Sequence, residues 1–209
     1  MQHRDRGRPP RIREPGVHQP LRQPPVEYIG WRQGDAAKLL IREALRDIDK
    51  KHAIALNVVT DPVSFRHLGR FGRRNTIDVV RGLCTRVTLH EWNEQSCAGI
   101  ICGCDAAVIP LDLADPFAAG KPENKLLLLW RMGLPVIAAA SPAYARAMTA
   151  AGLDLVCANE GDWRRQLERV VTDAALRADA GQRGRAHAET HFSEEQLLLR
   201  WDRLFETLI

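Results

Sequence analysis

The amino-acid sequence predicts a doubly wound α/β fold, a Rossmann-like parallel β-sheet with helices on both faces. Three observations indicate this fold. From residue 26 onward, short β-rich runs alternate six times with stretches whose apolar residues recur at helical spacing. Glycine, proline or aspartate follows several of the short runs, as expected where strands end and loops begin. The run at 105–110 is apolar on both of its faces, which is typical of parallel strands covered by helices.

The pattern begins with a candidate strand at 26–31 and a helix at 36–50. Leu40, Ala44 and Ile48 recur every fourth residue in that helix, so they define one apolar face. A turn that contains Gly34 separates the two elements. Together they form the first β–α unit of the expected sheet.

A second strand is expected at 54–60, because this β-branched run ends at Asp61-Pro62. Residues 64–83 are interpreted as a loop followed by a short helix. The third strand is expected at 86–90 and the fourth at 105–110, with a helix at 93–104 between them.

The second half of the chain follows the same alternation. A helix at 123–132 ends at Gly133, and a buried strand is expected at 134–140. Ser141-Pro142 begins the next helix, which extends to Ala151. The remaining elements are a strand at 154–158, helices at 161–173 and 175–190, and a capped amphipathic helix at 193–209.

The excess of positive charge belongs to the N-terminal segment. The net charge of the chain is +4, and residues 1–34 hold seven arginines against three acidic residues. Residues 1–25 also contain six of the twelve prolines, so we expect a disordered Arg/Pro-rich tail. Residues 26–209 then form one domain with little net charge, and no nucleic-acid binding is expected of it.

Membrane and metal sites are not expected. The longest apolar stretch stops at Arg131, short of the ~18 residues that a membrane span needs, and no secretory signal precedes it, so a cytoplasmic location is expected. The five cysteines form no C-x-x-C pair and are interpreted as reduced, buried thiols. His187 and His191 lack the glutamate that follows the first histidine of zinc hydrolases.

Two loops at strand carboxyl ends carry candidate binding residues. Lys121, Glu123, Asn124 and Lys125 gather at a helix start after the fourth strand. Lysine is unfavourable at that end of a helix dipole unless an anion is present, so a phosphate or diphosphate is one interpretation and two solvated lysines are the other. After the first strand, Gly30 and Arg32 form either a second wall for the phosphate or a tight turn with an exposed arginine.

The segments 104–112 and 121–144 together resemble the C-terminal, donor-binding domain of GT-B glycosyltransferases. The similarity lies in an aspartate-led strand that ends at Pro110, a helix that begins near Lys125, and the sequence Gly-Leu-Pro-Val-Ile at 133–137. The closing segment 191–208 is similar too, and the resemblance covers about residues 26–209 in order.

The resemblance implies that the chain binds a nucleotide-sugar as substrate, with no cofactor and no required metal. Lys121, Asn124 and Lys125 would face the donor diphosphate, and Arg32 with the Gly30 turn would approach it from the other side. Many relatives place a ribose-binding glutamate where this chain has Leu128, and Glu123 is the alternative acidic residue. A complete enzyme would be roughly twice as long, so the acceptor-binding N-terminal domain is expected to be missing.

Three functions remain open from the sequence. The first is a glycosyltransferase, or its donor-binding half, that transfers a sugar from a nucleotide-sugar to an acceptor. The second is a non-catalytic, degenerate donor domain that acts as an interaction module. Its last helix would carry an apolar face that either packs on its own sheet, docks on a protein partner or drives self-association. The third is an unrelated doubly wound protein that binds a phosphate ester.

Overall fold

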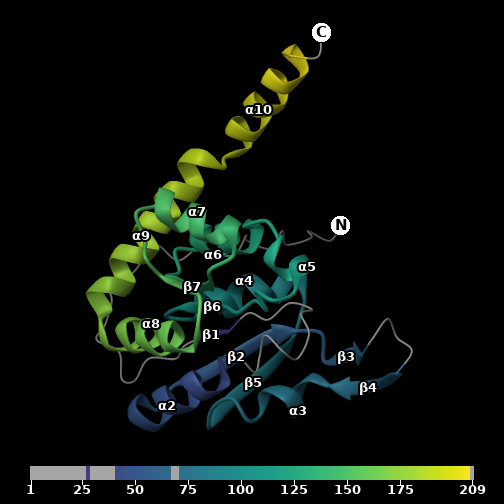
Figure 1. The fold of residues 1–209 in the computed structure, drawn as a ribbon, viewed down its shortest axis with the longest axis vertical. Helices are drawn as coiled ribbons and strands as arrows, with labels where there is room; N and C mark the ends of the chain where they lie inside the picture. The colour runs from purple at the N-terminus through teal and green to yellow at the C-terminus, as the bar shows by residue number, and fades with distance from the viewer. Residues whose placement is uncertain (1–26, 29–40, 67–70, 208–209) are drawn as a thin grey trace, which may run out of the picture.

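The computed structural model of the chain describes residues 27–28, 41–66 and 71–207 (Figure 1). The expected tail at 1–25 lies outside these residues, and so does the first part of the helix expected at 36–50. Within the described ranges, no helix is both long enough and apolar enough to cross a bilayer.

The main sheet has six parallel strands in the order β5-β2-β1-β6-β7-β8. From β1 the chain adds β2 and β5 on one side, and then returns to add β6, β7 and β8 on the other. This is the strand order of a doubly wound, Rossmann-like sheet, so the predicted fold class is confirmed. The strands are β1 (Glu27–Tyr28), β2 (Ala55–Thr60), β5 (Arg86–Glu91), β6 (Ala107–Ile109), β7 (Val136–Ala139) and β8 (Val156–Cys157).

Helices cover both faces of this sheet. They are α2 (Arg42–His52), α4 (Glu94–Cys102), α6 (Asn124–Arg131), α7 (Pro142–Ala150), α8 (Glu160–Thr172) and α9 (Ala174–His191). Because crossovers between parallel strands are right-handed, α2 covers one face, while α4, α6 and α7 cover the other. After β8, α8 packs on α2 and α9 returns to pack on α6.

The core lies between these helices and the sheet. Strand β7 and the residues around β6 are fully buried, and the apolar face of α6 contributes Leu126, Leu129 and Trp130. Two glycines let α9 approach α6 closely, since a Cβ atom at Gly184 would lie 2.5 Å from Trp130 Cδ1, and one at Gly181 would lie 2.3 Å from a backbone carbonyl oxygen. The fold therefore holds α6 firmly in place along its length.

The interpretation of residues 64–83 as a loop and a short helix was wrong in its first part. Strands β3 (Val63–Arg66) and β4 (Phe71–Asn75) pair as an antiparallel hairpin outside the main sheet, and the expected short helix follows as α3 (Thr76–Val80). Figure 1 shows the hairpin projecting beyond the main sheet. The hairpin was hard to recognise because both strands are short, β4 contains Gly72, and the pairing has a register shift between Phe65 and Arg66.

The last helix, α10 (Glu194–Glu206), extends away from the rest of the chain (Figure 1). None of its residues is buried. Its apolar side chains Leu198, Trp201 and Phe205 are 55–57% exposed. Packing of this helix on its own sheet was therefore a wrong alternative, and docking or self-association stays a prediction.

Candidate functional site

A cavity of about 750 Å³ is lined along the length of α4 and α6 and by Tyr144 of α7, and we call it the basic cavity. These helices follow the carboxyl ends of β5, β6 and β7, so their N-termini meet at the edge where parallel α/β sheets bind ligands. The residues that line the cavity are Trp92, Glu94, Cys97, Ala98, Ile101, Lys121, Pro122, Asn124, Lys125, Leu128, Leu129, Met132 and Tyr144.

The loop before α6 and the anchoring of that helix position the cationic side chains. Helix α5 (Pro116–Ala119) forms one turn in this loop, capped by the Asp115 side chain, which accepts a hydrogen bond from the Phe117 amide at 3.0 Å. The Lys121 amide then donates to the Ala118 carbonyl oxygen at 3.3 Å. Since the opposite face of α6 is fixed in the core, the backbone at Asn124 and Lys125 is held against the cavity.

Burial and mutual repulsion make the two lysines an unusual pair. Burial, with a smaller effect of the charge of Lys121, lowers the pKa of Lys125 to about 8. A group with this pKa is still mostly protonated at pH 7, so the cavity holds positive charge in a poorly hydrated place. A bound anion would relieve this cost, and the N–H groups that point out of the start of α6 would add hydrogen bonds.

Tyr144 lines the cavity from α7. Burial raises the pKa of its hydroxyl to about 12, and the negative charge of Glu123 contributes. The hydroxyl is therefore a neutral hydrogen-bond donor over the physiological range. The Ser141 side chain accepts a hydrogen bond from the Tyr144 amide at 3.3 Å and so caps α7.

Trp92 and Glu94 line the cavity from the segment that joins β5 to α4. Trp92 directly follows β5, its side chain is 40% exposed, and its amide donates to the Thr60 carbonyl oxygen at 3.2 Å. The Asn93 side chain accepts a hydrogen bond from the Gln95 amide at 2.8 Å, which begins α4 with Glu94 in its first turn. An indole ring and a carboxylate thus line the same cavity as Lys121 and Lys125.

The structure brings together three of the predicted site residues, Lys121, Asn124 and Lys125. Glu123 does not line the cavity, although its charge acts on Tyr144. Gly30 and Arg32 lie outside the described residues, so their part in the site stays a prediction.

Sequence reasoning missed Trp92, Glu94 and Tyr144 as site residues. The available signal was a large aromatic residue in a polar segment immediately after a strand, a place where binding residues concentrate.

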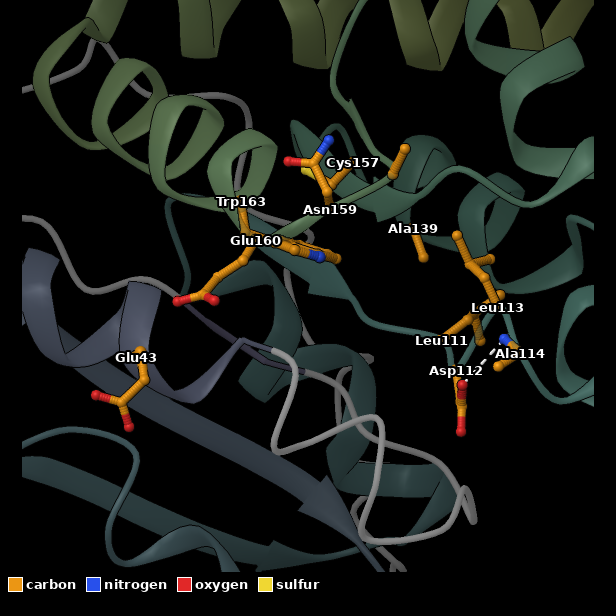
Figure 2. A pocket seen from close by; sticks show the side chains of 11 residues that line it. Glu43, Leu111, Asp112, Leu113, Ala114, Ala139, Cys157, Asn159, Glu160 and Trp163 are labelled. Carbon is orange, nitrogen blue, oxygen red and sulfur yellow. Dashed lines mark hydrogen bonds between the residues drawn. The ribbon is translucent and has the colours of Figure 1, made fainter.

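A second cavity, of about 420 Å³, lies beside the ends of β7 and β8 (Figure 2). Its carboxylates come from Glu43, Asp112 and Glu160, and Figure 2 shows Asp112 on the side away from the other two. Glu43 pairs with Arg46 at 3.0 Å, and Glu160 pairs with Arg164 at 2.7 Å. Over the described part of the chain, no three histidine, cysteine or acidic side chains could hold a metal ion together.

The thiol prediction is confirmed for Cys84 and Cys157, which are buried and free. Burial raises the pKa of Cys84 to about 11 and moves the pKa of Cys157 in the same direction. Cys102 is free as well, but its side chain is exposed, so the burial part of the prediction was wrong for it. Cys97 is half-buried and lines the basic cavity. His187 and His191 do lie side by side on α9, with ring centroids 4.7 Å apart.

The fold is similar to one domain of GT-B glycosyltransferases of known structure. WaaG, a glycosyltransferase involved in lipopolysaccharide biosynthesis, matches 81% of this chain with a TM-score of 0.60 and 19% identity, over 44% of its own length. S. aureus TarM, solved with fondaparinux, alpha-GlcNAc-glycerol and UDP, matches 91% with a TM-score of 0.63 and 14% identity, over 38% of its length.

Sucrose-phosphate synthase from Thermosynechococcus elongatus gives a similar result. It matches 91% of this chain with a TM-score of 0.62 and 17% identity, over 46% of its own length. The chain therefore spans less than half the length of each of these three structures. Neither a family model nor a curated protein matches the sequence. At these identities the likeness concerns the fold, and it confirms the resemblance to a GT-B domain.

Proposed function

We propose that this chain is the donor-binding part of a glycosyltransferase, which binds the nucleoside diphosphate of a nucleotide-sugar in the basic cavity. The observation that carries the proposal is the meeting of Lys121, Asn124 and Lys125 at the start of α6, in a cavity that Trp92 also lines. The fold supports it, since it is similar to nucleotide-sugar glycosyltransferase domains.

A diphosphate matches the electrostatics of the cavity. Its oxygens accept charge-assisted hydrogen bonds from Lys121 and Lys125, while the Asn124 side chain supplies a neutral donor. The positive end of the α6 dipole favours the same anion. Together these groups offset the desolvation that lowers the pKa of Lys125.

The same groups would assist sugar transfer. Negative charge develops on the departing diphosphate as the bond to the sugar breaks, and preorganised cations lower the barrier when they bind that charge more strongly in the transition state. Tyr144, a neutral donor in the same cavity, adds a hydrogen bond to the donor substrate. This chain would therefore provide donor binding and leaving-group stabilisation, and a separate surface would hold the acceptor.

A thermal-shift screen with UDP, GDP, ADP, CMP and dTDP tests the proposal. A ligand at ~100 times its dissociation constant adds about 2.7 kcal/mol to the free energy of unfolding, which is readily measured. One nucleoside diphosphate should raise the melting temperature, and Lys125→Ala should abolish the rise.

Lys50→Ala is the matched control for that variant. Lys50 lies on α2 with a 77% exposed side chain, so its loss should leave the nucleotide response intact. A cooperative unfolding transition that no nucleotide shifts would contradict the proposal.

Helix α10 favours a second candidate, the non-catalytic interaction module. Its exposed apolar face includes Leu198, Trp201 and Phe205. Under this candidate, sedimentation would show self-association that Trp201→Ser removes, and no nucleotide would bind. A monomer that responds to a nucleotide would favour the donor-binding function instead.

A further inference from the structure

The junction between α9 and α10 consists of Phe192 and Ser193, and it sets the direction in which α10 leaves the domain (Figure 1). Ser193 caps α10, since its hydroxyl accepts a hydrogen bond from the Gln196 amide at 3.2 Å. The Arg131 guanidinium, at the end of α6, donates to the Phe192 carbonyl oxygen. No residue of α10 is buried, so the contacts of the junction rather than packing of the helix hold α10 in its direction.

Arg200 connects α10 to the same junction. Its guanidinium donates a hydrogen bond to the His191 carbonyl oxygen at 2.7 Å. The Cζ atom of the same group lies 5.1 Å from the centroid of the Phe192 ring, and a cation over an aromatic face is attracted to it. Two arginines, one from α6 and one from α10, therefore hold the backbone and the ring of the junction.

His187 packs against this junction from the C-terminal part of α9. The centroid of its ring lies 4.7 Å from that of His191 and 5.8 Å from that of Phe192. The ring of Trp130 on α6 lies edge to face with it, at a centroid distance of 5.8 Å. The half-buried imidazole thus contacts both α6 and the junction, so it is placed to hold one against the other.

The surroundings of His187 favour its neutral form. The charged or titratable groups that meet at the junction are His191 from α9, Arg131 from α6 and Arg200 from α10, and all three are basic. Among the described residues, no hydrogen bond or ion pair joins His187 to a carboxylate. Burial, with a smaller effect of the charge of His191, lowers the pKa of His187 in agreement with this arrangement.

The indole of Trp130 gives a second reason for a neutral ring. Within the described residues, Trp130 Nε1 is buried and has no hydrogen-bond partner. A neutral imidazole beside it keeps one acceptor nitrogen, whereas an imidazolium has only donors. Protonation of His187 therefore puts a new positive charge next to an unpaired donor and a group of basic side chains.

We propose that the junction of α9 and α10 is a pH-sensitive hinge, in which the neutral ring of His187 holds α10 in its direction and protonation in mild acid releases it. The protonated ring leaves its contacts with Trp130 and Phe192 for water, which frees the junction. Histidine is the side chain whose ordinary titration lies closest to physiological pH. The closed junction binds this proton less readily than the open one, so the open population rises as the pH falls.

The hinge would control how α10 is presented. The exposed apolar face of that helix includes Leu198, Trp201 and Phe205, and its direction decides which surface of a partner it can meet. Acid would therefore change the interactions of α10 without a change in the main sheet. This inference does not rest on the proposed function, because the junction shares no residue with the lining of the basic cavity.

Amide hydrogen exchange of the full chain at about pH 7.5 and about pH 5.5 tests the hinge, since His187 titrates between these values when the junction is open. The rates are corrected for the chemical effect of pH on exchange. Protection should fall several-fold in acid for peptides that span residues 188–197. Peptides from β7 and α8 should keep their protection.

Three variants identify the group responsible. His187→Phe keeps an aromatic ring against Trp130 but cannot take up a proton, so the junction should be equally protected at both pH values. His187→Lys carries a charge at both, so it should release α10 even at neutral pH. His90→Gln is the matched control, because half-buried His90 lies 3.0 Å from Asn57 Oδ1 in the main sheet, and its loss should leave the response intact.

Three outcomes would overturn the inference. If His187→Phe retains the pH response, another group causes it. If protection falls alike throughout the domain, acid unfolds the chain and opens no hinge. If the junction of the unaltered chain is equally protected at both pH values, protonation of His187 does not release α10.

Discussion

Replacing Lys125 by methionine should stabilise the chain and destroy its anion site. The pKa of Lys125 is about 8 against an ordinary value of 10.5, so holding its charge in the folded chain at pH 7 costs on the order of 3 kcal/mol. Methionine fills similar space without charge, and it removes this cost. At ~2–4 °C per kcal/mol for a chain of this size, Lys125→Met should raise the melting temperature by several degrees without ligand.

The pH dependence of folding stability gives an independent test of the burial of Lys125. The unfolded lysine keeps its proton up to about 10.5, while the folded one loses it near 8, so the unfolded chain binds more protons between these values. Stability of the unaltered chain should therefore rise from pH 8 to pH 10.5. The contribution of Lys125 to diphosphate binding should fall over the same range, because only the protonated amine attracts the anion.

Differential scanning fluorimetry and calorimetric titration of a nucleoside diphosphate, each from pH 6.5 to pH 10, form the assay. Lys50→Met, at an exposed position of α2, controls for loss of one positive charge and should change neither quantity. A lower melting temperature for Lys125→Met, or unchanged nucleotide affinity, would refute the reasoning.

Three further predictions concern the fold around the site. Gly184→Ala should lower the free energy of unfolding by about 1–3 kcal/mol in a urea titration, because its Cβ would lie 2.5 Å from Trp130 Cδ1. An unchanged midpoint would show that α6 and α9 can separate freely. Burial, with a smaller effect of His191, lowers the pKa of His187, so the unfolded chain takes up a proton first as the pH falls through about 6.5, and the free energy of unfolding should drop. His187→Leu should flatten that part of a plot of stability against pH. An unaltered plot would contradict the prediction. Trp201→Ser should change the melting temperature of the domain by no more than its measurement error, because no residue of α10 is buried, and a clear loss of stability would mean that the helix packs on the domain.

The sequence could predict most elements of the main sheet, for a physical reason. The runs that became β2, β6 and β7 are short, apolar and bounded by turn residues, so their burial and their ends are both visible in the pattern. The hairpin of β3 and β4 could not be predicted because its short strands pair only with each other and Gly72 interrupts the alternation in β4. Strand pairing of this kind is decided by tertiary structure.

Only part of the candidate site could be predicted from the sequence. Lys121, Asn124 and Lys125 are close in the chain, so their gathering at one helix start could be predicted directly. Trp92 and Tyr144 reach the same cavity from different strand ends, and only the order of the strands brings them there. The amphipathic pattern of α10 indicates an apolar partner but carries no information about which surface covers it.

Hydrogen exchange of the full chain, with and without the nucleoside diphosphate that raises its melting temperature most, tests the central claim most directly, because it locates the bound nucleotide. The account predicts slower exchange at the first turns of α4 and α6, around Glu94 and Asn124, with little change in α8 and α10. Protection confined to the second cavity, beside the ends of β7 and β8, or no protection at a nucleotide concentration of several millimolar, would contradict it.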